Sequence, residues 1–333
     1  MDKVAVVIAA MNARDTVGRA VRSALAEAEV GEVVVVDDGS SDDTAATAQA
    51  ADDGSGRLSV LTLGINRGPS AARNHAIENS SSPLIAILDA DDFLLPGRFA
   101  PMLDADDWDF IADNILFVDA AWPDLATITA PQFAPDPRFL DLAGFIEGNV
   151  SRRGKERGEI GFLKPVMRRS FLEAHALTYR EEMRLGEDYD LYARALIRGA
   201  RYKILHSVGY GAVVRANSLS GRHRTLDLKC LWEADTAMLA DPHLTGRARV
   251  LVGEHAAHVR GRYELRRFLD SKAEKGLARA GISALARPAA LPGVAMGIVR
   301  DKLDAFRRRG AAAASAAPLP PRTLMPGRRV QLP

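Results

Sequence analysis

The sequence predicts an α/β protein whose first hundred residues form a parallel sheet with helices on both faces. Strand-like and helix-like segments alternate there, as in chains that build parallel sheets. The strands are short and largely apolar, and the first of them carries no charge, which is typical of strands buried on both faces. Polar residues follow each strand, at the edge where such sheets bind ligands. This edge is therefore the predicted site.

Four strands and three helices account for this first half. The predicted strands span Val4–Ala9, Glu32–Val36, Leu58–Leu63 and Ile85–Leu88. Asp15 is expected to cap a helix that runs to about Ala28, and Ser70 to cap a helix over Ser70–Asn79. A further helix is expected between Thr44 and Ala51.

After Asp92 the alternation is less regular. Further strands are expected at Phe110–Asp113, Ile115–Val118, Phe162–Met167 and Tyr202–Val214, and helices at Leu140–Glu147, from Ser170, and from Leu185 to Arg198. Helices alone follow, at Leu226–Leu239, Gly246–Leu269 and Lys272–Leu285. We predict one domain over 1–222 with halves at about 1–103 and 104–222, a helical region over 223–309, and a disordered tail over 310–333.

Composition excludes several classes of function. The 333 residues carry a formal net charge of +1, so no nucleic-acid partner held by bulk charge is expected. The single cysteine, Cys230, excludes an intrachain disulfide and a cysteine zinc cluster. The N-terminal apolar run is too short for a signal peptide, and no segment reaches the ~20 apolar residues of a membrane span. A cytoplasmic protein is predicted. Residues 293–309 mix apolar and basic side chains, so they fit either an amphipathic helix on an anionic membrane surface or a helix packed on the domain.

The strand Ile85–Leu88 ends at three carboxylates, Asp89, Asp91 and Asp92. Like charges this close repel one another unless a cation neutralises them. Carboxylate oxygens suit Mg²⁺ or Mn²⁺, which would in turn hold the phosphates of a ligand. A solvated acidic turn is the alternative interpretation.

Two further polar segments follow strands at the same edge. In Asp37–Ser40 a carboxylate could accept from the imide N–H of a uracil ring, or the segment could be a simple helix-capping turn. In Asn66–Asn74, Arg73 lies about one turn inside a helix whose N-terminus favours anions. Its guanidinium could bind a diphosphate, or it could be a surface arginine.

Four linked segments resemble family 2 glycosyltransferases of the GT-A fold, which have a Rossmann-like nucleotide-binding sheet and an acceptor-binding half. They are Val4–Asn12, the Val-Asp-Asp-Gly-Ser-Ser-Asp-Asp-Thr run from Val36, the Asn-Arg-Gly-Pro-Ser-Ala-Ala-Arg-Asn run from Asn66, and the Leu-Asp-Ala-Asp-Asp run from Leu88. The resemblance is dense to about Leu103 and continues to about Ser220.

The resemblance implies a UDP-sugar donor, less often a GDP- or dTDP-sugar, and Mn²⁺ or Mg²⁺. It implies that Asp91 is the principal metal ligand and that Asp89 lies near ribose and metal. The positions assigned to nucleotide binding are Ala9, Asn12, Asp38, Arg67, Arg73, Asp89 and Arg215. The chain departs from the family at Ala9–Asn12, where a Pro-Thr-Tyr-Asn-like run is usual, so Met11 must replace an aromatic contact to the base.

The resemblance also assigns an acidic pair at the start of a helix to catalysis. Asp188 matches the general base of an inverting transfer, with Glu187 as the alternative, although a helix cap would explain the same pair. His206 or His223 could complete the metal shell. Lys164, Trp108 and Asp113-Asn114 are candidates for the acceptor side, with core packing the simpler interpretation of Trp108.

Three details are similar to rhizobial exopolysaccharide glucosyltransferases of the succinoglycan type: Ile111–Asn114, Gly161–Pro165 and Gly186–Tyr189. They imply UDP-glucose as donor and a saccharide acceptor, lipid-linked, at the cytoplasmic membrane face, with membrane contact through the C-terminal region. Another donor (UDP-Gal, UDP-GlcNAc or GDP-Man) and a non-catalytic sugar-nucleotide-binding protein stay open. A nucleotidyltransferase or dehydrogenase is disfavoured, because no glycine-rich loop follows the first strand.

Overall fold

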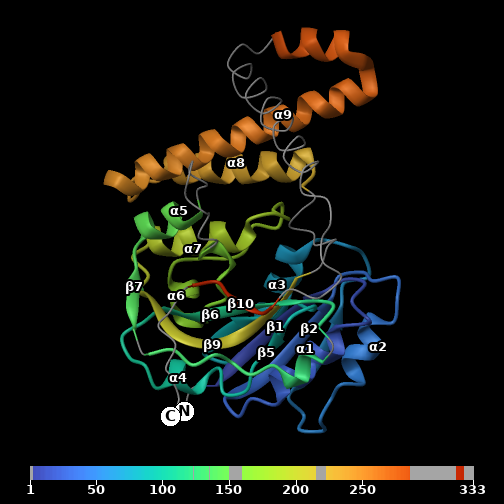
Figure 1. Cartoon of the computed structure of the whole chain (residues 1–333), viewed down its shortest axis with the longest axis vertical. Coiled ribbons are helices and arrows are strands. Elements are labelled where there is room, and N and C mark those ends of the chain that lie inside the picture. Colours follow the sequence, from blue (N-terminus) through green and yellow to red (C-terminus); the bar gives the residue numbers. More distant parts are fainter. Residues whose placement is uncertain are drawn as a thin grey trace. The chain divides into compact units, whose positions relative to one another are not determined.

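The computed structural model describes residues 3–122, 124–134, 136–149, 160–214, 223–285 and 320–325. The chain divides into two compact units, Met1–Ala216 with Leu319–Pro333, and Asn217–Pro318. The first unit contains the sheet, and the second contains long helices (Figure 1).

One sheet runs through the first unit in the order β3-β2-β1-β4-β8-β6-β9-β5, with β10 on β6 and β7 on β9. The strands are β1 Val4–Ala10, β2 Val30–Asp37, β3 Leu58–Thr62, β4 Leu84–Ile87, β5 Phe93–Leu94, β6 Phe110–Asp119, β7 Arg138–Leu140, β8 Val166–Arg168, β9 Tyr202–Val214 and β10 Arg322–Thr323. The helices of this unit are α1 Val17–Leu25, α2 Thr44–Gln49, α3 Pro69–Glu78, α4 Ala100–Leu103, α5 Leu142–Asn149, α6 Arg169–Ala174 and α7 Glu187–Ile197, with single 3-10 turns at Leu125–Thr127 and Ile160–Phe162.

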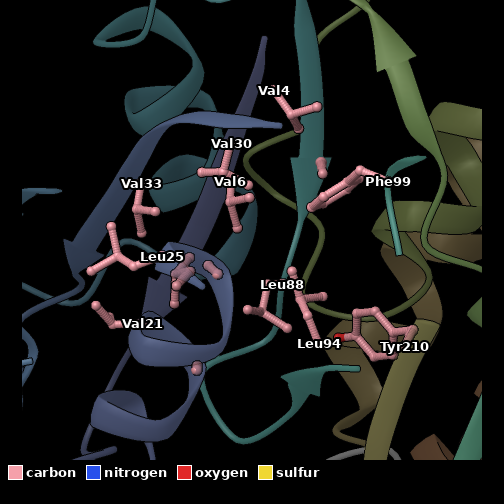
Figure 2. Close-up of a cluster of buried hydrophobic side chains, with 14 of the residues drawn as sticks. Val4, Val6, Val21, Leu25, Val30, Val33, Leu88, Leu94, Phe99 and Tyr210 are labelled. Carbon is pink, nitrogen blue, oxygen red and sulfur yellow. The ribbon is translucent and has the colours of Figure 1, made fainter. Parts of the chain in front are cut away.

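The first four strands confirm the predicted parallel sheet. β1 pairs in parallel with β2 and β4, and β2 with β3. Val4, Val6 and Ile8 of β1 belong to one buried apolar cluster with α1, and this cluster continues across the sheet to Tyr210 of β9 (Figure 2). α3 contacts β1 and β2 as well. Helices on both faces explain why the strands read as unbroken apolar runs.

Two predicted helix caps are wrong. α1 begins at Val17 after Thr16, and no side chain caps it, so Asp15 does not have the predicted role. α3 begins at Pro69, one residue earlier than expected, because a proline fits the first helical position and Gly68 before it has φ +99°. The Ser70 hydroxyl instead donates to the Met183 carbonyl at 2.7 Å.

The second half of the sheet is mixed. β8 is antiparallel to both β4 and β6, whereas β6 and β9 are parallel. The two strands predicted over 110–118 form the single strand β6, with register shifts near Asn114. Only the end of the strand predicted over Phe162–Met167 forms, as β8, because a 3-10 turn occupies Ile160–Phe162.

The predicted disordered tail over 310–333 is wrong for 320–325. Arg322 and Thr323 form β10, which is drawn in red in Figure 1 and pairs antiparallel with Phe117 and Leu116 of β6. The Leu324 N–H then donates to the Ile115 carbonyl at 2.9 Å. β8 pairs with β6 only at Phe110 and Ile111, so the backbone of β6 further along is available to β10. The composition of the tail gives no sign of this long-range pairing. The rest of the predicted tail lies outside the described residues.

The second unit contains α8, Thr225–Leu239, and α9, Gly246–Leu285. α9 takes the place of two predicted helices and is kinked at Gly276, which has φ 78° and ψ 165°. Within the described residues, none of the helices has the length and apolar composition that crossing a bilayer requires. The amphipathic segment predicted over 293–309 lies outside the described residues.

Candidate active site

Four elements bring charged side chains together at the carboxyl end of β4. Asp89 follows β4, Arg73 comes from α3, and Glu187 and Asp188 occupy the first turn of α7. Lys164 lies two residues before β8. Of these five side chains, three are acidic and two are basic. The cluster joins the two predicted halves of the domain.

Arg73 is 5% exposed and contacts three carboxylates of this cluster. One terminal nitrogen donates to Asp89 at 2.8 Å, and the other donates to Glu187 at 2.9 Å and to Asp188 at 3.3 Å. Its guanidinium also lies over the Tyr179 ring, 5.3 Å from the centroid. The interpretation of Arg73 as a surface arginine is therefore wrong. Its assignment to nucleotide binding remains a prediction.

Lys164 is buried and bridges two aspartates. Its Nζ lies 2.7 Å from Asp188 Oδ2 and 2.8 Å from Asp89 Oδ2. Burial alone would lower the pKa of Lys164, but Asp188 and Asp89 outweigh it and raise the pKa above its ordinary value. Burial likewise tends to raise the pKa of Asp89, but Lys164 and Arg73 hold it well below its usual range. Asp89 and Lys164 are therefore both charged at neutral pH.

Asp92 lies beside the cluster in an apolar setting. Its carboxylate accepts from the Tyr210 hydroxyl at 2.8 Å and from the Val213 N–H at 2.8 Å. Burial and the charges of Asp89 and Asp91 raise the pKa of Asp92 to about 8. The Tyr210 hydroxyl also accepts from the Asp89 N–H at 3.1 Å, so this ring fixes the loop that carries the acidic motif. The Asp91 carbonyl accepts from Arg19.

Asp38 anchors the loop after β3. Its two carboxylate oxygens accept from the backbone N–H groups of Arg67, at 2.6 Å, and Gly68, at 2.8 Å. The Arg67 side chain donates to Glu181 at 2.8 Å. Asp38 therefore holds the backbone of the next loop in place, which the sequence did not indicate. Its contact with the nucleotide remains a prediction.

Asn12 joins two loops of the same edge. Its N–H donates to the Ser40 hydroxyl at 2.8 Å, and its side-chain oxygen accepts from the Ser41 N–H at 2.9 Å. Ala9 pairs with Val36 of β2 one strand position before this loop. Met11, at the departure from the family, is 48% exposed. The residues assigned to the nucleotide thus lie along one edge, with Arg215 outside the described residues.

Among the described residues, no three acidic, histidine or cysteine side chains converge as a metal site would require. His206 instead lies 3.8 Å from Asp136, and His223 acts electrostatically on Asp227 in the second unit. A divalent ion held through Asp91 and Asp89 would take its other ligands from phosphate and water, which suits Mg²⁺ and Mn²⁺. The carboxylates present therefore fit such an ion.

The acceptor-side candidates are all buried. Asp113 and Asn114 are fully buried, so the prediction that they contact the acceptor is wrong. Trp108 is 1% exposed and donates to the Ala105 carbonyl at 2.9 Å, which favours core packing. Lys164 lies inside the charged cluster. In the sequence, Lys164 stands out only as a single charge in an apolar stretch. The neighbouring residues do not indicate that it pairs with Asp89 and Asp188.

A comparison with known families finds that residues 5–173 match the family described as Glycosyl transferase family 2. The chain is 61% identical over 310 residues to the succinoglycan biosynthesis protein ExoU of Rhizobium meliloti (strain 1021), which covers 93% of this chain and 91% of that protein. It is 38% identical over 299 residues to the succinoglycan biosynthesis protein ExoO of the same organism, with 88% and 84% covered.

Two solved structures share the fold at low sequence identity. TarS 1–349 of S. aureus in complex with UDP-GlcNAc is 18% identical, with a TM-score of 0.57 over 88% of this chain and 78% of that one. The mannosyltransferase PcManGT from Pyrobaculum calidifontis, in complex with GDP-Man and Mn²⁺, is 17% identical, with a TM-score of 0.52 over 91% and 80%. These likenesses confirm the predicted GT-A fold.

Proposed function

The chain belongs to glycosyl transferase family 2 and is a glycosyltransferase, and from this premise we propose that it transfers glucose from UDP-glucose to a saccharide acceptor, with inversion, in succinoglycan-type exopolysaccharide synthesis. The pathway is supported by 61% identity to ExoU over nearly the whole chain. The observation that carries the reaction is the buried cluster in which Asp188, the candidate base, shares Lys164 and Arg73 with Asp89 of the acidic motif.

The donor site is assigned to the edge formed by the loops after β1, β2, β3 and β4. Asp38 and Asn12 tie the loops after β1, β2 and β3 together through hydrogen bonds, which supports a preorganised surface for the nucleotide. Asp91 and Asp89 would hold Mn²⁺ or Mg²⁺. When bound, the ion would stabilise the negative charge that develops on the departing diphosphate.

The proposed reaction is a single displacement at the anomeric carbon. An acceptor hydroxyl oxygen forms a bond to that carbon while the bond to the diphosphate oxygen breaks, and UDP leaves with the electron pair. The hydroxyl proton passes to the Asp188 carboxylate. Attack opposite the leaving group inverts the configuration and produces a β-linkage from an α-linked donor.

Glu187 is the alternative base. Both carboxylate oxygens of Asp188 accept from cations, whereas Glu187 contacts Arg73 through one oxygen. An ionised carboxylate oxygen has two lone pairs, so these contacts leave Asp188 able to accept a proton. Comparing Asp188→Asn with Glu187→Gln separates the two, because only loss of the base should abolish transfer.

For the acceptor we propose a lipid-linked oligosaccharide at the cytoplasmic membrane face, with peripheral contact through the C-terminal region. The relatives' names, which refer to succinoglycan biosynthesis, support a saccharide acceptor. The basic, apolar composition of residues 293–309 supports the membrane location. UDP-Gal, UDP-GlcNAc and GDP-Man stay as alternative donors. A non-catalytic sugar-nucleotide-binding protein is disfavoured because the acidic pair Glu187-Asp188 is intact.

The test is release of nucleotide from a panel of donor sugars, with Mn²⁺, with Mg²⁺ or with EDTA. We expect metal-dependent UDP release from UDP-glucose, and a loss of about 10²–10⁴-fold in Asp188→Asn, the range that general-base catalysis supplies. Asp91→Ala should lose activity together with the metal response. A chain that needs its acceptor would still bind UDP in calorimetry when metal is present. Absence of both turnover and binding would overturn the proposal.

A further inference from the structure

We propose that Lys164 is a positioning residue that ties the candidate base Asp188 to Asp89 on the donor side. The inference rests on the proposed function and deepens it. The Lys164 ammonium lies within 2.8 Å of an oxygen of each aspartate. It is assigned no contact with substrate, so it acts through the carboxylates that it holds.

The charges explain why a cation is needed here. Asp89 and Asp188 come from different halves of the domain, and two carboxylates brought together in a partly buried site repel each other. Lys164 is 6% exposed, and a buried ammonium is stable only when it is paired. The three groups therefore stabilise one arrangement together, which none of them would hold alone.

Arg73 completes a closed ring with the same two aspartates. It donates to Asp89 Oδ1 and Asp188 Oδ1, while Lys164 contacts Oδ2 of both. Each aspartate is thus held by one arginine and one lysine, on opposite oxygens. Both the position and the rotation of the Asp188 carboxylate are defined in this ring. The orientation of the base is thereby coupled to Asp89, two residues before the proposed metal ligand Asp91.

The backbone of Lys164 is anchored as firmly as its side chain. Its carbonyl accepts from Arg98 at 2.5 Å, and Arg98 forms a fully buried ion pair with Asp113 at 3.0 Å. Pro165 follows and restricts the main chain. Gly209 lies against this pair, where an added Cβ would overlap Arg98 and Asp113. A long flexible side chain fixed at both ends is well suited to positioning another group.

The test compares Lys164→Met with Lys203→Met, a matched loss of a lysine that pairs with Asp106 in the same half. Donor turnover gives kcat, calorimetry gives the Kd for UDP-glucose, and thermal unfolding reports folding. We expect Lys164→Met to lower kcat by about 100-fold, the cost of a base misplaced by roughly 1 Å, with Kd within about threefold of wild type. Ethylamine should restore kcat of Lys164→Ala by about tenfold and leave Lys203→Ala unchanged, because a free amine can replace the missing charge.

The outcomes separate this inference from the proposed function. A wild-type chain that neither turns over nor binds a nucleotide sugar overturns both. An active wild type whose Lys164→Met keeps kcat within about threefold, or whose Kd rises as much as kcat falls, overturns the role of Lys164 alone. If Lys164→Met does not fold, the same kcat and Kd are measured for Lys164→Gln, which retains N–H donors without the charge. If the Met, Ala and Gln variants of Lys164 all fail to fold, and ethylamine does not restore folding, then Lys164 is needed for stability and the inference is overturned.

Discussion

The two halves of the first unit build one sheet in different ways. In residues 4–87, the strands β1 to β4 occupy consecutive places in the sheet and pair with one another in parallel. β5 at Phe93–Leu94 is the exception in the first half, because it pairs antiparallel with β9. In residues 104–214, β6 pairs with β9 and β8 lies between β4 and β6, so partners come from distant parts of the chain. The first half relies on local alternation of strand and helix. The second relies on specific long-range contacts. Variants that remove such contacts should therefore lower the free energy of unfolding more than variants in the first half.

The largest stability effect is expected at the buried pair in which Arg98, near the end of the first half, meets Asp113 of the second half. Arg98→Met leaves the Asp113 carboxylate buried without its cation, so the free energy of unfolding should fall by about 3–5 kcal/mol. The matched control is Arg201→Met, which removes a half-exposed pair with Asp109 of the same 3.0 Å length and should cost much less, because water screens the charge of an exposed guanidinium. Urea denaturation measures both. Equal losses of unfolding free energy in the two variants would contradict the view that burial makes the Arg98–Asp113 pair more costly to break.

The next effect concerns the C-terminal strand. The Asn114 amide donates to the Met325 carbonyl at 2.7 Å and accepts from the Met325 N–H at 2.8 Å. Asn114→Ala leaves both groups unpaired in a buried place, at a cost of about 1–3 kcal/mol for each. Hydrogen exchange at Leu324 should become faster. In a chain ending at residue 319, the same substitution should cost less, and an equal cost would show that Asn114 does not act through β10.

A smaller loss is expected at Gly209. Gly209→Ala places a methyl group against Arg98 and Asp113, and such overpacking costs about 1–3 kcal/mol. Gly253→Ala in α9 is the control, because open space surrounds that position and alanine favours helix by about 0.5–1 kcal/mol. Thermal unfolding should therefore shift in opposite directions for the two variants. A shift in the same direction would contradict the contact geometry.

The smallest effect is expected in the first half, at the anchor of the Arg67-Gly68 loop. Asp38→Asn keeps one acceptor for two backbone N–H groups, so the loop should loosen while the sheet persists. The Kd for UDP should rise about tenfold, which corresponds to about 1.4 kcal/mol. Asp52→Asn, which affects an exposed turn at Gly54, is the control and should leave Kd unchanged. Calorimetry measures both constants, and a large loss of unfolding free energy in Asp38→Asn would weaken the contrast between the halves.

Much of the first half could be predicted from residues alone. β-branched runs such as Val4–Ile8 form buried strands because no other local structure accommodates them as well, and the carboxyl ends of parallel strands meet at one edge. The sequence therefore determined the fold class, the edge at which the candidate site lies, and the acidic motif that follows β4. The family resemblance built on those motifs is confirmed by the family match over residues 5–173.

Only the tertiary structure decided which charges meet. Arg73, Asp89, Lys164 and Asp188 are spread over more than a hundred positions, and Coulomb attraction depends on distance in space, which no local pattern encodes. The same holds for the tail: the composition of 320–325 favours disorder, yet β6 has unpaired hydrogen-bonding groups that order this segment as β10. The residue types thus determine which charged and polar groups this protein has, and long-range packing determines which of them come into contact.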